Sequence, residues 1–478
     1  MIRRSVLAGV TILGMSAAGC ALGPNYRRAD VAIPPAYRGV TVPQAQSLAD
    51  ARWFELFAEP ELNALIREAL DNNLDLLAAV ARVEEFRARA GLARAQLGPT
   101  VQGVFNTSPT PKPDIDNGYR AGLVFNWELD FFGRLRRSSE AARADLLASV
   151  GGARAAMASL VSDVAQTWFT LRSLDEQAEI TRRTIATQEK SLELVRTLML
   201  GGLASGADES QAINQLATTR GQLPIIDRRR AQAENFLSVL VGRPPSAIQR
   251  AAATESFPVP PQIPVGLPST LLERRPDVAA AEATVRAATA RVGVAMANRL
   301  RIPVIGLTGT FGMVSTALTD LFTGHDSGDG LSSFGPFASA PLVDSGRGRH
   351  GVEIAAAQLR QTELNWRNTV LVSLREVADA LVAVDTVREE IAQNETRVTA
   401  ARDSLRLTEL RYRGGVASYL EVLDTQRQLF SAEIDCAQSR RALLLGFVEL
   451  YRALGGGWSD EQLRTLAISD RDHTIKPR

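Results

Sequence analysis

The chain has few of the side chains that usually build catalytic or metal sites, with two cysteines and three histidines among 478 residues. Cys20 and Cys436 lie at opposite ends, so no intramolecular disulfide is expected even in a compartment that permits one. Cys436 falls in a helical stretch, where a buried, inert thiol is expected. The histidines (His325, His350 and His473) are scattered along the sequence. The sequence therefore predicts neither an enzyme nor a metal or cofactor site.

An excess of charge of one sign is also missing, because 54 Lys and Arg balance 53 Asp and Glu. No basic block is present, which excludes nucleic acid as a partner. The glycine run at 455–457 follows a helix-like segment and not a strand, so it does not predict a phosphate cradle.

The apolar stretch at 6–15 is too short to cross a membrane, and we interpret residues 1–19 as a processed signal peptide. Two arginines precede the stretch, and Ala17-Ala18-Gly19 leads directly into Cys20, as in the lipobox of bacterial lipoproteins. Cys20 is therefore expected to carry a diacylglycerol and an N-acyl chain. The alternative is an ordinary signal cut near Ala18, with Cys20 left as a stray thiol.

The second half of the sequence resembles the first half after a shift of 213 residues. In both halves apolar residues recur at seven-residue intervals. They are Met157, Val164, Leu171, Ala178, Ile185, Leu192 and Met199 in the first copy, and Val370, Val377, Val384, Ile391, Val398, Leu405 and Tyr412 in the second. Such a repeat requires a supercoiled helical partner. We therefore predict one architecture built from two repeats, 53–260 and 261–458, after a lipid-anchored linker at 20–52 and before a polar tail at 459–478.

Each repeat is expected to contain two strands and a helical hairpin. The strands are predicted at about 101–107, 119–128, 304–313 and 332–342, and the hairpins at 131–241 and 345–454. Each long helix would extend about 100 Å at 1.5 Å per residue. Ala121, Leu123, Phe125 and Trp127 share one face of their strand, as expected for a transmembrane β-strand or for a soluble hairpin packed on the helices. If the strands do span a membrane, four cannot close a barrel, so the protein must oligomerise.

Several motifs, in the same order, resemble the TolC-like outer-membrane factors of the NodT-type lipoprotein subgroup. The motif segments are 23–26 (GPNY), 127–136 (WELDFFGRLR), 266–278 (GLPSTLLERRPDV), 411–424 (RYRGGVASYLEVLD) and 450–458 (LYRALGGGW). They cover nearly the whole chain, from Cys20 to Trp458.

The resemblance implies a mainly helical fold with a small β part. It implies a homotrimer with a 12-stranded barrel in the outer membrane and a helical barrel in the periplasm of a Gram-negative bacterium. The implied function is the exit duct of a tripartite efflux system for small molecules such as drugs, dyes or metals. The implied partners are a periplasmic adaptor, an inner-membrane pump that is driven by protons, and outer-membrane lipid. Ala21, which follows Cys20 where some lipoproteins have Asp, favours export to the outer membrane.

Glu421 and Asp424 are three residues apart beyond a Gly-Gly bend and would share one helical face. In a trimer they would form rings of carboxylates that favour cations and raise one another's pKa. Asp208 corresponds to Glu421 in the first repeat. By resemblance the acidic pair faces the pore constriction and Tyr412 helps to hold the gate closed. The alternative is an exposed helical face without a gating role.

The bends themselves are Gly201-Gly202-Leu203 and Gly414-Gly415-Val416, where glycine supplies a positive φ for helix reversal. By resemblance they contact the adaptor, whereas the alternative is a purely structural turn. Ala417 stands where the family's best-known member has an arginine that bonds the closed gate. Two other functions remain open, a type I protein-secretion duct and a lipid-anchored periplasmic scaffold.

Overall fold

The computed structural model describes residues 21–37, 59–108, 118–250, 268–299, 304–315, 318–319, 329–461 and 463. The predicted signal peptide, Cys20 and most of the linker lie outside these residues. So do His325 and His473.

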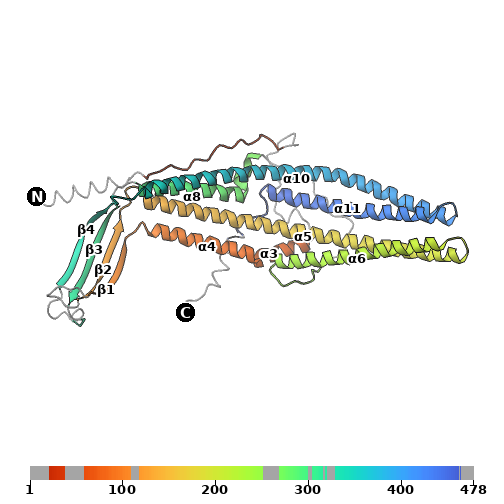
Figure 1. Ribbon diagram of the computed structural model, residues 1–478, viewed down its shortest axis with the longest axis horizontal. Helices are drawn as coiled ribbons and strands as arrows, with labels where there is room; N and C mark the ends of the chain where they lie inside the picture. Colours follow the sequence, from red (N-terminus) through yellow and green to blue (C-terminus); the bar gives the residue numbers. More distant parts are fainter. Residues whose placement is uncertain are drawn as a thin grey trace. The chain divides into compact units, whose positions relative to one another are not determined.

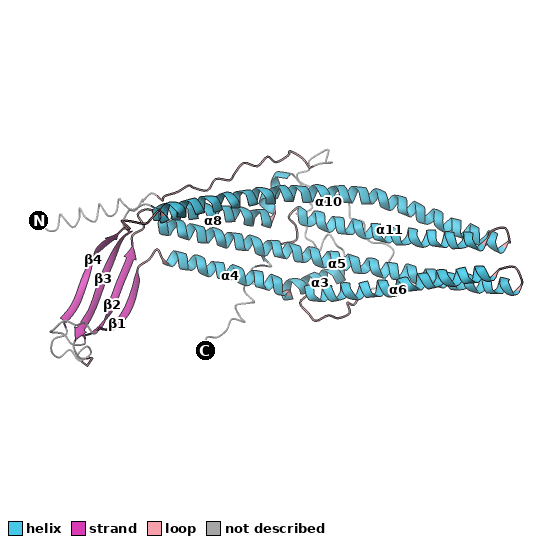
Figure 2. Cartoon of the chain, viewed as in Figure 1, coloured by secondary structure: helices cyan, strands magenta, loops and turns pink. Residues whose placement is uncertain are grey.

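The order of elements repeats once along the chain, as the internal duplication predicts (Figures 1 and 2). The first set comprises α3 (Pro60–Asn72), α4 (Leu74–Ala95), β1 (Thr100–Ser108), β2 (Gly118–Glu128), α5 (Arg134–Leu200) and α6 (Gly206–Leu240). The second comprises η2 (Pro268–Thr270), α7 (Leu271–Arg274), α8 (Pro276–Arg299), β3 (Val304–Ser315), β4 (Asp329–Ser339), α10 (Arg347–Arg413) and α11 (Tyr419–Ala453). The two long helices have 67 residues each and the two return helices 35 each.

The long helices begin two to three residues later than their predicted starts at 131 and 345. Gly133 and Gly346 have φ angles of +75° and +86°, so the chain turns there before the helix can start. An aspartate closes each turn: the Asp130 carboxylate accepts the backbone N–H groups of Leu135 and Arg136 at 3.0 and 2.8 Å. Asp344 plays the same part before α10.

The four strands form one antiparallel sheet in the order β1-β2-β3-β4. The last strand was predicted three residues too late at both ends, because β4 begins at Asp329 and ends at Ser339. The apolar Leu342 beyond Pro341 lies outside it. Pro336 lies within β4, which is an edge strand among the described residues of one chain, and a proline is tolerated at such a position. In the described residues β1 and β4 each pair on one side only.

One face of this sheet is apolar and open. Cross-strand partners place Leu123 beside Phe311 and Ala121 beside Met313, so the side chains predicted to share a face do share it. Val101, Phe105, Leu123, Phe311 and Phe334 all lie on this face and are 50–63% exposed. The opposite face carries mainly polar residues and glycine, such as Gln102, Asn126 and Thr308. The apolar face of the sheet is therefore not buried against the described helices of the same chain.

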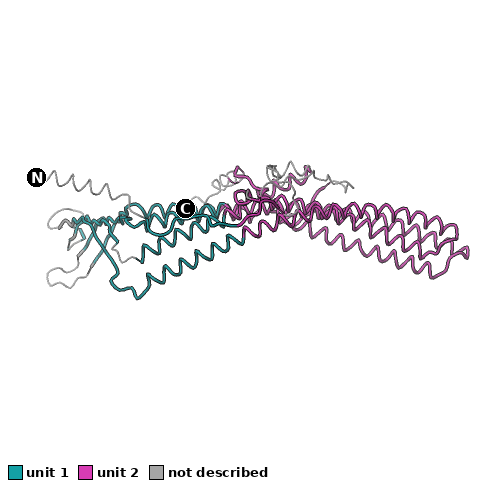
Figure 3. Tube along the Cα trace, turned by 90° about the horizontal axis from the view of Figure 1, so that it is seen from above, with its two compact units in different colours: residues 1–31, 82–150, 280–368 teal, residues 32–81, 151–279, 369–478 magenta. Residues whose placement is uncertain are grey.

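The chain divides into two compact units, shown in separate colours in Figure 3. Unit 1 comprises Met1–Val31, Arg82–Val150 and Ala280–Asn368 and contains the sheet. Unit 2 comprises Ala32–Ala81, Gly151–Ala279 and Thr369–Arg478 and contains both hairpin tips.

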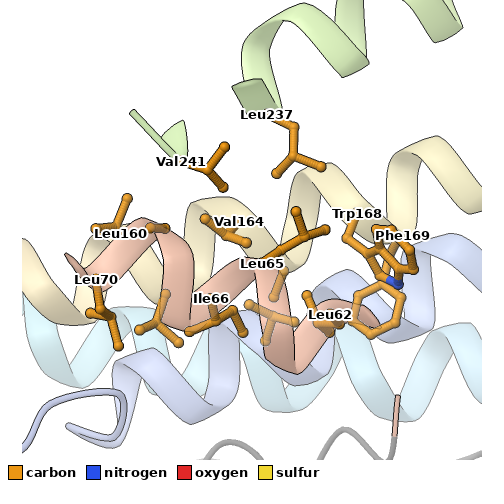
Figure 4. Packing of buried hydrophobic residues seen from close by; sticks show 14 of the residues in the cluster. Leu62, Leu65, Ile66, Leu70, Leu160, Val164, Trp168, Phe169, Leu237 and Val241 are labelled. Carbon is orange, nitrogen blue, oxygen red and sulfur yellow. The ribbon is translucent and has the colours of Figure 1, made fainter. Parts of the chain in front are cut away.

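The largest core of unit 2 forms where the short helix α3 packs between long helices (Figure 4). Leu62 and Ile66 of α3 are fully buried against Val164 and Trp168 of α5 and Leu237 of α6. The Trp168 indole N–H donates to the Glu59 carboxylate, which satisfies the one polar atom that this ring buries.

The predicted heptad stripes are the buried stripes of the long helices. Met157, Val164, Leu171 and Ala178 on α5 are fully buried, and on α10 Val370, Val377 and Val384 are at most 3% exposed. Beyond these residues the stripe positions are mostly only partly buried. An 18-residue window of α5 is apolar enough to pass a composition test for a membrane helix, but core helices pass the same test.

Two arginines with buried side chains, Arg250 and Arg275, form ion pairs between segments of unit 2. Arg250 bonds the Asp175 and Glu234 carboxylates, each at 2.5 Å, and so holds the segment after α6 against α5. Arg275, in the motif segment 266–278, pairs with Asp277 at 2.6 Å and Glu376 at 2.7 Å. Asp460, in the predicted polar tail, pairs with Arg154 at 2.6 Å.

Candidate functional site: the tips of the helical hairpins

Both hairpin tips reverse the chain with the same hydrogen bonds. The N–H of Leu203 bonds the carbonyl of Leu198 at 2.8 Å, and the N–H of Val416 bonds that of Arg411 at 3.0 Å. The preceding glycines, Gly202 and Gly415, have φ angles of +74° and +73°. This is the Schellman arrangement, in which glycine takes the left-handed position. Gly201 and Gly414 end their helices and donate to carbonyls one turn back.

The helix after each turn begins with a capping box. Ser205 and Ser418 are the N-cap residues, and their side chains accept from the backbone N–H groups of Asp208 and Glu421. Each carboxylate in turn accepts the N–H of its own serine, at 2.9 Å for Asp208 and 3.0 Å for Glu421. The correspondence between Asp208 and Glu421 that the repeat predicts is therefore also a correspondence of position and bonding.

The two acidic residues of the second hairpin have different surroundings. The hydrogen bond from the Ser418 backbone is the main reason that the pKa of Glu421 is lowered, and Arg411 at 3.6 Å adds to it. Asp424 is exposed and accepts a hydrogen bond from Gln428 at 2.7 Å. Within one chain Glu421 thus has a capping role, and the rise in pKa predicted for a ring of carboxylates would have to oppose this lowering.

Tyr412 lies against the first turn of the next helix and near the other hairpin. Its ring centroid is 5.4 Å from that of Tyr419, and its hydroxyl is buried without a hydrogen bond. Burial and the nearby Asp208 carboxylate both raise the pKa of Tyr412, and burial is the main reason that the pKa of Tyr419 rises to about 12. The structure therefore brings Tyr412 and Asp208 together from different hairpins.

The two hairpins are joined by polar contacts that sequence reasoning missed. The Arg427 guanidinium donates to the Gln215 side chain at 2.6 Å, and Gln426 donates to the Ser191 hydroxyl at 2.9 Å. Apolar residues on α5, α6 and α11 surround these bonds, Val195, Leu216 and Leu423 among them. The repeat aligns Gln215 with Gln428, but nothing in the sequence shows that Arg427 reaches across.

A small cavity of about 190 Å³ adjoins Tyr412. It is bordered on the α5 side by Lys190 and Leu194 and on the other side by Glu409 and Tyr419. The ends of the turns are exposed: Leu203 is 79% and Val416 67% accessible. In the described part of the chain no three His, Cys, Asp or Glu side chains cluster closely enough to hold a metal ion.

Comparison with known protein families identifies the family of the whole chain. The model of the family described as "Outer membrane efflux protein" matches residues 65–243 and 267–456. The chain belongs to the outer membrane efflux protein family. It is therefore an outer-membrane efflux channel, and the family resemblance of its motifs is confirmed.

Two curated members of the family are similar over nearly their full length. Outer membrane protein OprJ of Pseudomonas aeruginosa is 31% identical over 461 residues, which cover 94% of this chain and 95% of OprJ. Probable outer membrane lipoprotein SilC of Salmonella typhimurium is 32% identical, over 92% of this chain and 96% of SilC.

A solved structure of the family supports the fold. The open state of the MtrE outer membrane channel of Neisseria gonorrhoeae superposes with a TM-score of 0.82 at 30% identity, covering 92% of this chain and 98% of MtrE. A mainly helical chain with one four-stranded sheet is thus the fold of an outer-membrane efflux channel, as the sequence predicts.

Proposed function

We propose that the chain works as a homotrimer and forms the exit duct of a tripartite efflux system. In this proposal a periplasmic adaptor connects it to a proton-driven inner-membrane pump, and small molecules such as drugs, dyes or metals leave through it. In this proposal the partners drive the opening of the duct.

The open sheet is the observation that supports the trimer. Its apolar face exposes residues such as Phe105 and Phe334, and the outer edges of β1 and β4 have no partner strand in the part of the chain that the structure describes. Lipid offers no hydrogen bonds, so a sheet in the bilayer must be closed into a barrel. Three copies of four strands give twelve, an even number within the range of outer-membrane barrels.

Disulfide crosslinking between copies tests this closure. We expect Gln102→Cys on β1, combined in turn with Ser333→Cys, Gly335→Cys or Phe337→Cys on β4, to give covalent trimers in at least one pair. All four positions lie on the polar face. The control replaces Gln102→Cys with Asn126→Cys on the inner strand β2. It should give no covalent trimers, because β2 is already paired on both sides. Monomeric particles without crosslinks in any pair would contradict the proposal.

We also propose that Cys20 is acylated and anchors the mature chain to outer-membrane lipid. SilC, which is named a lipoprotein, supports this. The intact mass of the mature protein should exceed that of the unmodified chain from Cys20 by a diacylglycerol and one acyl chain. A Cys20→Ala variant should lose that added mass.

The gate is proposed to lie where the tips of three chains meet. Tyr412 and Asp208 would hold neighbouring hairpins together, and rings of Glu421 and Asp424 would face the narrow mouth. The buried, unbonded hydroxyl of Tyr412 supports this, because an adjacent copy can supply its partner. Adaptor binding at Leu203 and Val416 would then separate the hairpins and widen the ring.

The tip contact can be tested with the turns left intact. Leu203→Asp and Val416→Asp change exposed side chains and not the glycines, so both hairpins should fold. We expect weaker adaptor binding and loss of efflux, with unchanged trimer assembly. Leu364→Asp on α10, also exposed, is the control. Normal efflux in both tip variants would contradict adaptor docking at these residues.

A further inference from the structure

A second cavity, of about 360 Å³, lies in unit 1 near the start of α5, remote in sequence from the hairpin tips. Its charged lining is mainly basic, with Arg136 and Arg143 of α5 and Arg286 of α8. Glu140 is the acidic residue in the lining, and it is paired with Arg137 at 2.7 Å. Leu97, Ala144 and Leu147 supply an apolar side, and Leu147 is 55% exposed.

Two polar groups of this lining have no partner among the described residues. Ser139 is 3% exposed, and its hydroxyl is buried without a hydrogen bond. Arg143 is exposed, and no hydrogen bond or ion pair is recorded for its guanidinium. A buried hydroxyl without a partner is costly, so a ligand that bonds it would be favoured. Arginines beside a hydroxyl suit a phosphate, which takes several charge-assisted hydrogen bonds.

The cavity lies beside the end of β2, where the sheet passes into the helices of unit 1. Trp127, at the end of β2, donates its indole N–H to the carbonyl of Leu97, which lines the cavity. Tryptophan is enriched at the boundary between lipid and water. The segment that follows Cys20 is attached at the same place, since the N–H of Leu22 bonds the carbonyl of Phe132 at 3.2 Å.

The distance of Ser139 from the start of α5 is comparable to the thickness of a lipid headgroup layer. Ser139 lies five residues after Arg134, which is about 8 Å at 1.5 Å per residue. The headgroup layer on one side of a bilayer is about 5–8 Å thick. With the end of β2 at the membrane boundary, the guanidinium groups of Arg136 and Arg143 would lie within side-chain reach of phospholipid phosphates.

We propose that this cavity binds the phosphate of a phospholipid from the periplasmic leaflet of the outer membrane. Arg143 binds the phosphate oxygens, and the Ser139 hydroxyl donates to one of them. Arg136 keeps its hydrogen bonds to Asp130, at 3.3 Å to the carboxylate and 3.0 Å to the carbonyl, and offers the phosphate its remaining N–H groups. Leu97 and Leu147 contact the glycerol and the first carbons of the acyl chains. This rests on the outer-membrane location of the channel and adds a lipid ligand distinct from the acyl chains on Cys20.

Native mass spectrometry of the acylated full-length protein in mild detergent tests the proposal. Dioleoylphosphatidylglycerol is titrated, and dioleoylglycerol, which lacks the phosphate, is the matched lipid. Arg143→Gln should weaken phosphatidylglycerol binding roughly tenfold or more, as expected for the loss of a charge-assisted bond. Arg143→Lys should restore part of it. Arg367→Gln, an exposed arginine of unit 1 for which no bond is recorded, is the control and should bind like the wild type.

Three binding results would each overturn the proposal, and so would one change of oligomeric state. They are equal phosphatidylglycerol binding by Arg143→Gln, equal binding of dioleoylglycerol by the wild type, or displacement of the lipid by millimolar inorganic phosphate. Dissociation of Arg143→Gln into monomers with an unchanged lipid count per chain would also overturn it, because the cavity would then hold a neighbouring copy. A wild type that neither trimerises nor conducts ions would refute the proposed function separately, since lipid binding can still be counted on a monomer.

Discussion

At the scale of the residue, the hairpin tips depend on two serines that start the return helices. Ser205 and Ser418 each accept a backbone N–H and hold a carboxylate in place. Ser418→Ala should lower the free energy of unfolding by about 1 kcal/mol, the usual effect of losing an N-cap. The loss should appear as faster hydrogen exchange over residues 419–422. Ser205→Ala should have an equal effect on the first hairpin, and a loss in one hairpin alone would show that the two tips are not equivalent.

Also at the residue scale, charge and capping can be separated at Glu421. Glu421→Gln keeps an oxygen that accepts from Ser418, so the helix should start normally while the charge is lost. Combined with Asp424→Asn, it should reduce the cation selectivity of the open channel, measured as a reversal potential in a planar bilayer. Asp379→Asn, on an exposed face of α10, is the control. Unchanged selectivity in the double variant would refute the pore-facing assignment.

The pH dependence of the same carboxylate follows from its hydrogen bonds. The pKa of Glu421 is lowered below 4.5, so its ionised form stabilises the folded tip above the unfolded pKa. That contribution is lost as the pH falls through the lowered value. Tip stability, followed by hydrogen exchange, should therefore decrease on acidification below about pH 4.5 in the wild type and less in Glu421→Gln.

At the scale of the element, the long helices depend on buried heptad positions. Leu171 on α5 is fully buried, so Leu171→Ala should cost about 2–5 kcal/mol through lost contacts and a cavity. Leu200→Ala, at the 88% exposed end of the same helix, should change stability by less than about 0.5 kcal/mol. Thermal unfolding followed by circular dichroism measures both, and equal effects would contradict the assigned stripe.

The elements also show what sequence can predict. The seven-residue period can be read from the local sequence, and the residues that repeat with it are the ones that become buried. The long helices and the burial of Leu171 and Val377 could therefore be predicted. The first residues of the long helices could not be predicted, because they depend on the backbone conformation of one residue, such as the positive φ of Gly133. The pairing of Arg427 with Gln215 depends on packing between residues 212 apart in sequence, and no local pattern encodes it.

At the scale of the whole molecule, the two faces of the sheet should respond oppositely to charge. Leu123→Arg places a charge on the face proposed to meet lipid, which costs about 2–4 kcal/mol near the bilayer midplane. We expect fewer heat-modifiable trimers in the outer-membrane fraction. Gln102→Arg, on the polar face, should assemble normally. Equal assembly of both variants would indicate that the apolar face does not contact lipid.

The outer edges of β1 and β4, which have no partner strand among the described residues, have a consequence for the chain before it reaches the membrane. A newly exported copy carries two free edges and exposed phenylalanines through an aqueous compartment, where such edges promote aggregation. Correct closure stops at three copies, whereas wrong pairing at a free edge can continue with further copies, so a higher concentration favours wrong pairing. Overproduction should therefore raise the aggregated fraction more than proportionally, and periplasmic chaperones that cover the edges would increase the yield of functional channels.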